Sequence, residues 1–251
     1  MNEYLKNLNR IEFIVTRACT GRCRHCQNGD PDNSSGHIDP ELAADAVRRL
    51  SERYSVESVM TFGGEPLLYP DVVCAIHRAA AGAGIGIRQL ITNGFFSNEH
   101  NRIETVVREL AESGVNDLLL SADAFHQETI PTEPVKYFAE CAVRLALPIT
   151  LQPSWLVSRE DGNPYNMRTR EVLREFDALR IPVDPGNVVF PMGNARKYLA
   201  GYFDENTDPS SPYDEDPRDI RAISFEPNGD VLNGNAYKTD ILEIIEAYRP
   251  D

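Results

Sequence analysis

The stretch IEFIVTRACTGRCRHC, residues 11–26, joins a short apolar run to three closely spaced cysteines. The run Ile11–Thr16 is rich in β-branched residues and predicts a strand. Cys19, Cys23 and Cys26 follow it with the spacing C-x3-C-x2-C. Three thiolates on one short loop can converge on a single inorganic centre. The stretch therefore predicts a strand that leads directly into a metal-binding loop.

Strand-like runs continue to alternate with segments of helical periodicity along the chain. The expected strands are Ile11–Thr16, Ser58–Phe62, Ile85–Thr92, Asp117–Ser121, Ile149–Ser154 and Asn187–Phe190. The expected helices are Pro40–Tyr54, Pro70–Ala81, Asn98–Ser113, Glu133–Leu145 and Arg168–Leu179. This alternation predicts a parallel sheet with right-handed crossovers. Six units are fewer than the eight that close a full barrel, so the predicted fold class is α/β, a partial, open (β/α)6 TIM-like barrel.

The pattern changes after residue 203. Residues 204–219 contain seven acidic residues and three prolines, which is typical of an exposed loop or linker. Ile223–Glu226 and Val231–Leu232 are expected to pair as a hairpin through a two-residue turn, before a helix over Asp240–Tyr248. The predicted organisation is a barrel over residues 1–203, a linker over 204–219, and a hairpin-helix extension over 220–251 that packs on the barrel.

Charge and hydropathy exclude several classes of protein. The 251 residues include 25 Lys and Arg against 39 Asp and Glu, which gives a formal net charge of −14. That charge disfavours binding to nucleic acid or to an anionic membrane surface. No apolar run approaches the roughly 20 residues that span a bilayer, and Met1–Arg10 lacks the apolar core of a secretory signal. We therefore expect a cytoplasmic protein.

The three clustered cysteines allow two kinds of metal centre. A structural zinc site takes four protein ligands, so His25 or His37 would have to complete it. A cubane iron–sulfur cluster with three protein ligands instead leaves one iron open to a small molecule. Cys74 and Cys141 lie far away in helical patterns and are expected to be buried structural thiols. A non-catalytic iron–sulfur or zinc protein, serving electron transfer or as a scaffold, stays open as the alternative.

Several motifs together resemble the radical S-adenosylmethionine (radical SAM) superfamily. The cysteine spacing resembles the signature of that family, and further resemblances recur at the ends of the expected strands. They are Gly63-Gly64-Glu65-Pro66 after the second strand, Thr92-Asn93-Gly94 after the third, Ser121-Ala122-Asp123 after the fourth, and Asn228-Gly229-Asp230 in the tail. The resemblance covers roughly residues 10–250.

This resemblance implies a set of cofactors and a reaction. Cys19, Cys23 and Cys26 would hold one [4Fe-4S] cluster, whose fourth iron binds the methionine end of S-adenosylmethionine (AdoMet). Reduction by an external donor such as flavodoxin or ferredoxin would release a 5′-deoxyadenosyl radical, which abstracts a hydrogen atom from the substrate. No cysteine follows Cys141, so a second cluster with four thiolates is not expected in the tail.

The resemblance also implies roles for individual residues. Gly63 and Gly64 allow a close backbone approach, and Glu65 can accept from the ammonium group of AdoMet. Ser121 and Asp123 are candidates for the ribose hydroxyls or the methionine end. The other expected cofactor contacts are His25, Pro66, Asn93, Gln152, Pro191 and Met192, with His25, Pro191 and Met192 placed near adenine. His126 is the candidate catalytic residue, as a proton shuttle.

The substrate class follows less directly from the sequence. We expect hydrogen abstraction either from a peptide, in a ribosomal natural-product pathway, or from a small metabolite. The compact tail resembles trimmed peptide-modifying members of the family, which favours a peptide.

Overall fold

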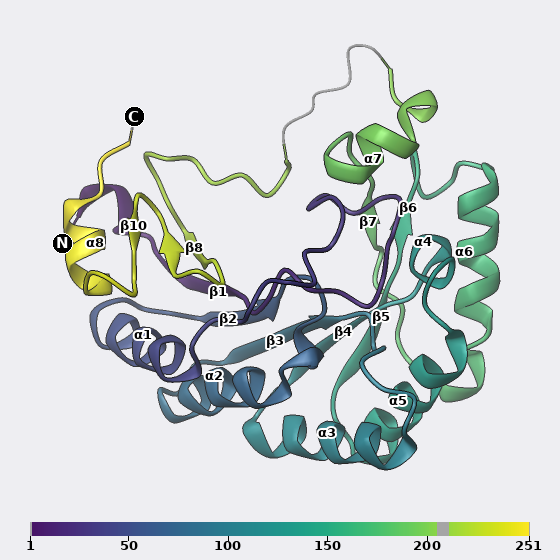
Figure 1. Ribbon diagram of the computed structural model, residues 1–251, viewed down its shortest axis with the longest axis horizontal. Helices are drawn as coiled ribbons and strands as arrows, with labels where there is room; N and C mark the ends of the chain where they lie inside the picture. Colours follow the sequence, from purple (N-terminus) through teal and green to yellow (C-terminus); the bar gives the residue numbers. More distant parts are fainter. Residues whose placement is uncertain (1, 205–210, 251) are drawn as a thin grey trace.

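The computed structural model describes residues 2–204 and 211–250. Its central feature is a curved parallel sheet whose outer face is covered by helices (Figure 1). Its six strands follow the order β5-β4-β3-β2-β1-β8, and every neighbouring pair is parallel. The strands are β1 (Arg10–Ile14), β2 (Ser58–Phe62), β3 (Ile87–Thr92), β4 (Asp117–Ser121), β5 (Ile149–Gln152) and β8 (Ala222–Phe225). The predicted α/β partial barrel is confirmed.

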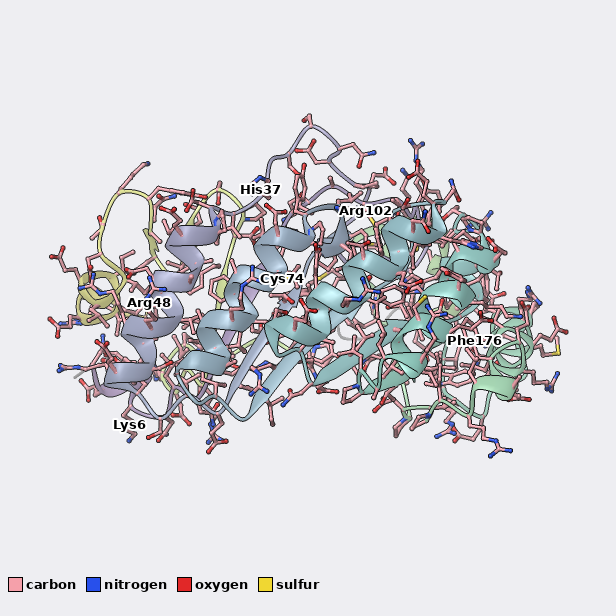
Figure 2. All side chains as sticks on the ribbon, turned by 90° about the horizontal axis from the view of Figure 1, so that it is seen from below. Lys6, His37, Arg48, Cys74, Arg102 and Phe176 are labelled. Atoms are coloured by element: carbon pink, nitrogen blue, oxygen red, sulfur yellow. The ribbon has the colours of Figure 1, made fainter. Side chains whose placement is uncertain are left out.

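The helices α1 (Pro40–Arg53), α2 (Pro70–Gly82), α3 (His100–Ser113) and α5 (Thr132–Arg144) connect successive strands and lie side by side in Figure 2, which views their layer from outside. The other helices of the described residues are α4 (Ala124–Gln127), α6 (Pro164–Arg174), α7 (Gly193–Tyr198) and α8 (Ile241–Ala247). Short 3-10 turns cover Glu3–Leu5, Pro66–Leu68, Asp177–Leu179 and Ala200–Tyr202. Asp39 caps α1 by accepting from the backbone N–H groups of Glu41 and Leu42. None of the helices in the described ranges has the length and apolar character to cross a membrane.

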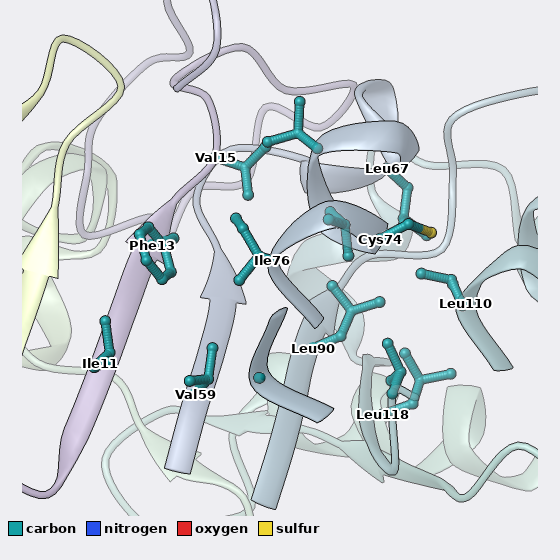
Figure 3. Packing of buried hydrophobic residues seen from close by; sticks show 14 of the residues in the cluster. Ile11, Phe13, Val15, Val59, Leu67, Cys74, Ile76, Leu90, Leu110 and Leu118 are labelled. Carbon is teal, nitrogen blue, oxygen red and sulfur yellow. The ribbon is translucent and has the colours of Figure 1, made fainter. Parts of the chain in front are cut away.

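The main hydrophobic core lies between the sheet and the helices. Alternate residues of each strand, such as Ile11 and Phe13 in β1, point toward the helix layer and are fully buried (Figure 3). Cys74 in α2 and Cys141 in α5 belong to the same core. Both thiols are therefore structural, as predicted, and neither lies on the cysteine loop.

The opposite, concave face carries a row of polar side chains. Ser224 donates to Glu12 (2.6 Å), and Arg10 donates to both Glu12 (2.7 Å) and Gln89 (3.0 Å). Gln89 in turn donates to Asp117 (2.6 Å). We call these five residues the polar row. It crosses from β8 to β4 and is partly accessible, since the side chains of Arg10 and Glu12 are 31% and 18% exposed.

The hairpin predicted for the tail is confirmed only at its turn. The chain turns back after β8, since the N–H of Glu226 donates to the carbonyl of Asp230 at 2.8 Å. As a strand, however, β8 joins the main sheet parallel to β1. The physical reason is burial, because Phe225 stacks on Phe13 with ring centroids 4.9 Å apart. A ladder of antiparallel pairs forms one step later, between β9 (Asp230–Val231) and β10 (Gly234–Asn235). The final helix α8 forms as predicted.

The expected sixth strand is shorter than predicted. It forms only as β7 (Asn187–Val188), which pairs in parallel with β6 (Ser154–Trp155), a short strand separated from β5 by Pro153. A bridge between Leu151 and Val183 links the segment before β7 to β5.

Part of the expected acidic linker, residues 205–210, lies outside the described residues, so the proposed boundaries at 203 and 219 stay predictions.

Candidate functional site

The cysteine loop follows β1 at the carboxyl edge of the sheet. Its three thiols are free; Cys23 is buried, and Cys19 and Cys26 are half-buried. The backbone N–H of Gly21 donates to Cys19 Sγ (3.3 Å), and Asn93 Nδ2 approaches the same sulfur at 3.6 Å. Polar hydrogens therefore already point at one of the sulfurs.

The thiols are electrostatically suited to a cation. Burial, together with nearby Glu65, raises the pKa of Cys19 to about 12. Burial likewise raises the pKa values of Cys23 and Cys26 above their ordinary range. A coordinating metal offsets this effect, because its charge stabilises the thiolate. Three buried or half-buried thiols without disulfide bonds thus fit a site that is completed by a positively charged centre.

The arrangement of the thiols bears on which centre fits. A tetrahedral zinc ion holds its sulfur ligands about 3.8 Å apart. Within the described ranges, the one group of three ligand side chains close enough for a single ion is His25, Asp123 and His126, whose ligand atoms lie within 4.8 Å of one another. The three thiols do not form such a group. His37, the other zinc candidate, packs its ring on Tyr69 and contacts the carbonyl of Ile38. Among the described residues, neither histidine therefore joins the three thiols in a group that could hold one ion.

The end of β2 supports the cysteine loop through backbone contacts. The N–H of Gly64 donates to the carbonyl of Thr16, and the N–H of Glu65 donates to that of Ala18, both at 2.8 Å. A Cβ on Gly64 would lie 2.0 Å from the Ala18 oxygen, and one on Gly63, whose φ is +141°, would lie 2.5 Å from the Thr16 oxygen. The close approach expected of both glycines is therefore made to the root of the cysteine loop.

Glu65 links the end of β2 to the end of β3. Its buried carboxylate accepts from the Thr92 hydroxyl (2.6 Å) and from the backbone N–H groups of Asn93 (2.8 Å) and Leu67 (2.9 Å). Burial raises its pKa to about 7, against these hydrogen bonds. Pro66 begins the 3-10 turn that follows. A contact between Glu65 and the ammonium group of AdoMet stays a prediction.

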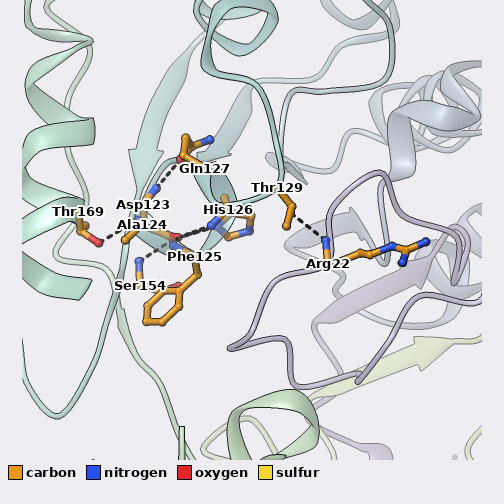
Figure 4. Close-up of polar contacts among 9 residues, drawn as sticks. All are labelled: Arg22, Asp123, Ala124, Phe125, His126, Gln127, Thr129, Ser154 and Thr169. Carbon is orange, nitrogen blue, oxygen red and sulfur yellow. Dashed lines mark hydrogen bonds and ion pairs between the residues drawn. The ribbon is translucent and has the colours of Figure 1, made fainter. Parts of the chain in front are cut away.

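The end of β4 supports the loop from the other side, through Asp123 and the residues after it (Figure 4). The buried Asp123 carboxylate accepts from the backbone N–H groups of Phe125 (2.9 Å), His126 (3.0 Å) and Ser154 (3.0 Å). It also accepts from His126 Nδ1, which lies 2.9 Å from each oxygen. Burial opposes ionisation, but these His126 contacts lower the pKa of Asp123 below its ordinary value.

Three aromatic rings join this region to the cysteine loop. His25, next to Cys26, packs against Phe125 and His126, with ring centroids 4.7 and 4.9 Å away. Burial lowers the pKa of His25 to about 4. Its Nδ1 is buried and has no hydrogen-bond partner within the described part of the chain. An orphaned polar atom at this place fits a site that a ligand completes.

Further contacts from α4 and the segment after it complete this support. The N–H of Arg22 donates to Thr129 Oγ1 (3.0 Å), and the Arg24 guanidinium pairs with Glu128 (3.3 Å). Ile130 packs against Gly21, since a Cβ there would lie 3.0 Å away from it. Phe125 and Glu128 thus engage the cysteine loop.

The first residues of α7 contact the cysteine loop on a third side. Gly193, with φ of +54°, sits so close that a Cβ would lie 2.3 Å from the Gln27 oxygen. The N–H of Asn194 donates to the Cys26 carbonyl at 2.9 Å. Pro191 and Met192, expected near adenine, come directly before Gly193 in the chain.

The structure gathers the predicted site residues at one edge. Ser121 and Gln152 are register partners at the ends of β4 and β5, and both are half-buried. The sequence reasoning missed Thr92, Thr129 and Asn194. Thr92 and Asn194 follow strand-like runs, which is a usable signal. Thr129 has no such signal, because its role depends on where α4 packs.

Comparisons with known proteins agree with this geometry. The family model for the Radical SAM superfamily matches residues 13–147. The GTP 3′,8-cyclase of Lactiplantibacillus plantarum is 31% identical over 120 residues, which are 46% of this chain and 33% of that protein. The GTP 3′,8-cyclase of Moorella thermoacetica is 26% identical over 129 residues, 50% of this chain and 38% of the relative. The chain thus spans less than half the length of these curated relatives.

Solved structures share the fold at low identity. A structure of anSMEcpe with bound AdoMet has a TM-score of 0.61 and 14% identity, covering 95% of this chain and 80% of that one. Streptococcus suis SuiB bound to S-adenosylmethionine gives 0.57 and 14%, covering 95% and 65%. BtrN in complex with AdoMet and 2-DOIA gives 0.53 and 15%, covering 97% and 83%. Because the family model covers more than half of the sequence, the chain belongs to the radical SAM superfamily of enzymes.

Proposed function

We propose that this chain cleaves AdoMet reductively at one [4Fe-4S] cluster and abstracts a hydrogen atom from a substrate. The observation that carries the proposal is the set of three free thiols on one loop, which contacts with the ends of β2 and β4 hold at the carboxyl edge of the sheet. Cys19, Cys23 and Cys26 would hold the cluster. When bound and reduced, the cluster supplies the electron that breaks the sulfonium bond of AdoMet.

The residues around the loop would bind and orient AdoMet. Glu65 and Asn93 lie on the β2–β3 side, where a hydrogen-bond acceptor can meet the ammonium group. Ser121 and Gln152 offer polar atoms at the ends of β4 and β5. On the opposite side of the loop, His25, Pro191 and Met192 would enclose the adenine.

His126 would act from the α4 side. Asp123 holds its Nδ1, so the other ring nitrogen is the one able to exchange a proton or donate a hydrogen bond. The role that the sequence suggested for Asp123, a direct contact to ribose, fits less well, because its oxygens already accept from four donors.

The substrate is proposed to be a peptide or a polar small molecule, with flavodoxin or ferredoxin as the electron donor. Both substrate classes occur among similar proteins. The curated relatives carry the name of a GTP cyclase, whereas SuiB has also been solved with its precursor peptide SuiA. The polar row on the concave face supports a substrate with hydrogen-bonding groups in either case.

Anaerobic reconstitution tests the proposal. The wild type should bind about four irons and four sulfides and release deoxyadenosine with dithionite and AdoMet. Replacing any of Cys19, Cys23 or Cys26 by Ala should abolish both properties, whereas the Cys141→Ala variant should retain them. A four-iron cluster that never cleaves AdoMet would support the electron carrier, and one zinc without sulfide would support the zinc site. Either result would overturn the proposal.

A further inference from the structure

The Asp123 carboxylate has no capacity left for an external ligand. An ionised carboxylate offers about four acceptor positions. Three are taken by the backbone N–H groups of Phe125, His126 and Ser154, and the His126 ring faces both oxygens. Asp123 is fully buried. Any effect it has on a ligand must therefore pass through a neighbour.

That neighbour is His126, whose orientation is fixed by the contact. Nδ1 must carry a proton, because a carboxylate oxygen can only accept. The Nε2 atom is thereby left as the polar atom that the pair can offer to a ligand. Burial disfavours the charged ring, yet Asp123 raises the pKa of His126 overall. The pair therefore favours an Nε2 that also carries a proton.

The free edge of the His126 ring faces the proposed cofactor site. In Figure 4 it points away from Asp123, toward the loop that carries Arg22. Its ring meets His25 edge-on, one residue before Cys26. The charged and titratable groups that influence it are Asp123 and Glu65, with His25 packed against it. The side chain is 15% exposed, so its surroundings are largely desolvated.

We propose that Nε2–H of His126 binds the methionyl carboxylate of AdoMet, and that Asp123 is the residue that positions it. The carboxylate is the one anionic group of AdoMet and so the best acceptor for this donor. This inference rests on the proposed function, since it requires AdoMet beside the cysteine loop.

Two ligands separate this contact from a general loss of structure. AdoMet and methylthioadenosine share adenine and ribose, but only AdoMet has the carboxylate. Their dissociation constants are measured by calorimetry on the oxidised, reconstituted protein, in which AdoMet stays intact. His126→Asn keeps an amide donor toward Asp123 but has no atom at the Nε2 position. It should weaken AdoMet about ten- to hundredfold, as expected for loss of a hydrogen bond to a charged group, and change methylthioadenosine less than threefold. Asp123→Asn should act in the same direction.

A spectroscopic measurement tests the positioning role without ligand. Nitrogen-15 NMR of the imidazole should show a protonated Nδ1 in the wild type and an altered proton distribution in Asp123→Asn, because an amide no longer demands that proton. His126→Asn leaves the backbone contacts of Asp123 in place, so it remains informative if Asp123→Asn does not fold. Unchanged AdoMet affinity in His126→Asn, or equal weakening of both ligands, would overturn the inference. A wild type that binds no AdoMet would instead overturn the proposed function.

Discussion

The cysteine loop is held from two sides by contacts of different kinds. On the β2 side, Gly64 and Glu65 bind the loop through backbone hydrogen bonds at 2.8 Å, with no room for a Cβ on Gly64. On the α4 side, the contacts come from side chains, among them the ring of His126 and the hydroxyl of Thr129. The β2 side fixes the position of the loop. On the α4 side, a substitution can change the chemistry of the site with little change of the backbone.

The largest effect is expected from Gly64→Ala, which disrupts the backbone contacts between the β2 side and the loop. Its Cβ would meet the Ala18 carbonyl at 2.0 Å, and neither backbone can yield without losing the hydrogen bonds that join them. The free energy of unfolding should fall by at least about 3 kcal/mol, measured by urea denaturation of the metal-free protein.

Gly36→Ala provides the matched control within the same loop, because nothing lies within 4 Å of its added Cβ. Its unfolding free energy should stay within about 0.5 kcal/mol of the wild type. Similar losses for both variants would show that the loop, rather than its contact with β2, is sensitive to any substitution.

A pH dependence should arise from Glu65 on the same side. Its pKa is about 7 in the folded protein against an ordinary 4.5, so the folded state holds its proton over a range where the unfolded state has lost it. Stability should therefore fall as pH rises from about 4.5 to 7, by at most about 3 kcal/mol, and then level off. In Glu65→Gln this component should vanish from urea midpoints measured across the range. An unchanged slope would contradict the assignment.

A smaller effect is expected from Thr129→Val on the α4 side. The substitution removes the acceptor of the Arg22 N–H, which lies at an exposed position and can turn to water instead. We expect a loss of about 1 kcal/mol in the free energy of unfolding and faster amide exchange at Arg22. Thr105→Val, on the exposed face of α3, should leave that amide unchanged. Equal amide exchange at Arg22 in both variants would show that Thr129 does not support the loop.

The smallest effect is expected from Arg24→Ala. Its ion pair with Glu128 is at 3.3 Å, but the two side chains are 51% and 35% exposed. Such pairs contribute little, so the urea midpoint should stay within the error of the measurement and any difference should shrink in high salt. A clear fall of the midpoint that persists in high salt would mean that the α4 side is more rigid than its exposed contacts indicate.

Local pattern predicted much of the framework. β2 and β4 begin and end where their apolar runs indicate, and α1 starts at Pro40, as expected. The tail was different, because the placement of Ile223 and Phe225 depends on the open edge beside β1. Burial of apolar surface at that edge, rather than the turn motif, decides which strand β8 pairs with.

The position of the site was also predictable from the sequence, but its internal contacts were not. The strand ends that carry the motifs do meet at one edge, as parallel strands require. What could not be predicted is the partner of each group. The sequence allows Asp123 to face a ligand, and only the positions of the Phe125, His126 and Ser154 N–H groups show that its oxygens are engaged inside the protein.

The polar row has a consequence for the kind of chemistry this barrel can host. Its partly exposed carboxylates and guanidinium stay open to solvent at the floor of the concave face. A carbon-centred radical attacks C–H bonds, which are weaker than the O–H bonds of water. Under the proposed function, solvent at this floor would be inert toward the radical, and a substrate could keep its hydration at one end while it reacts at the other.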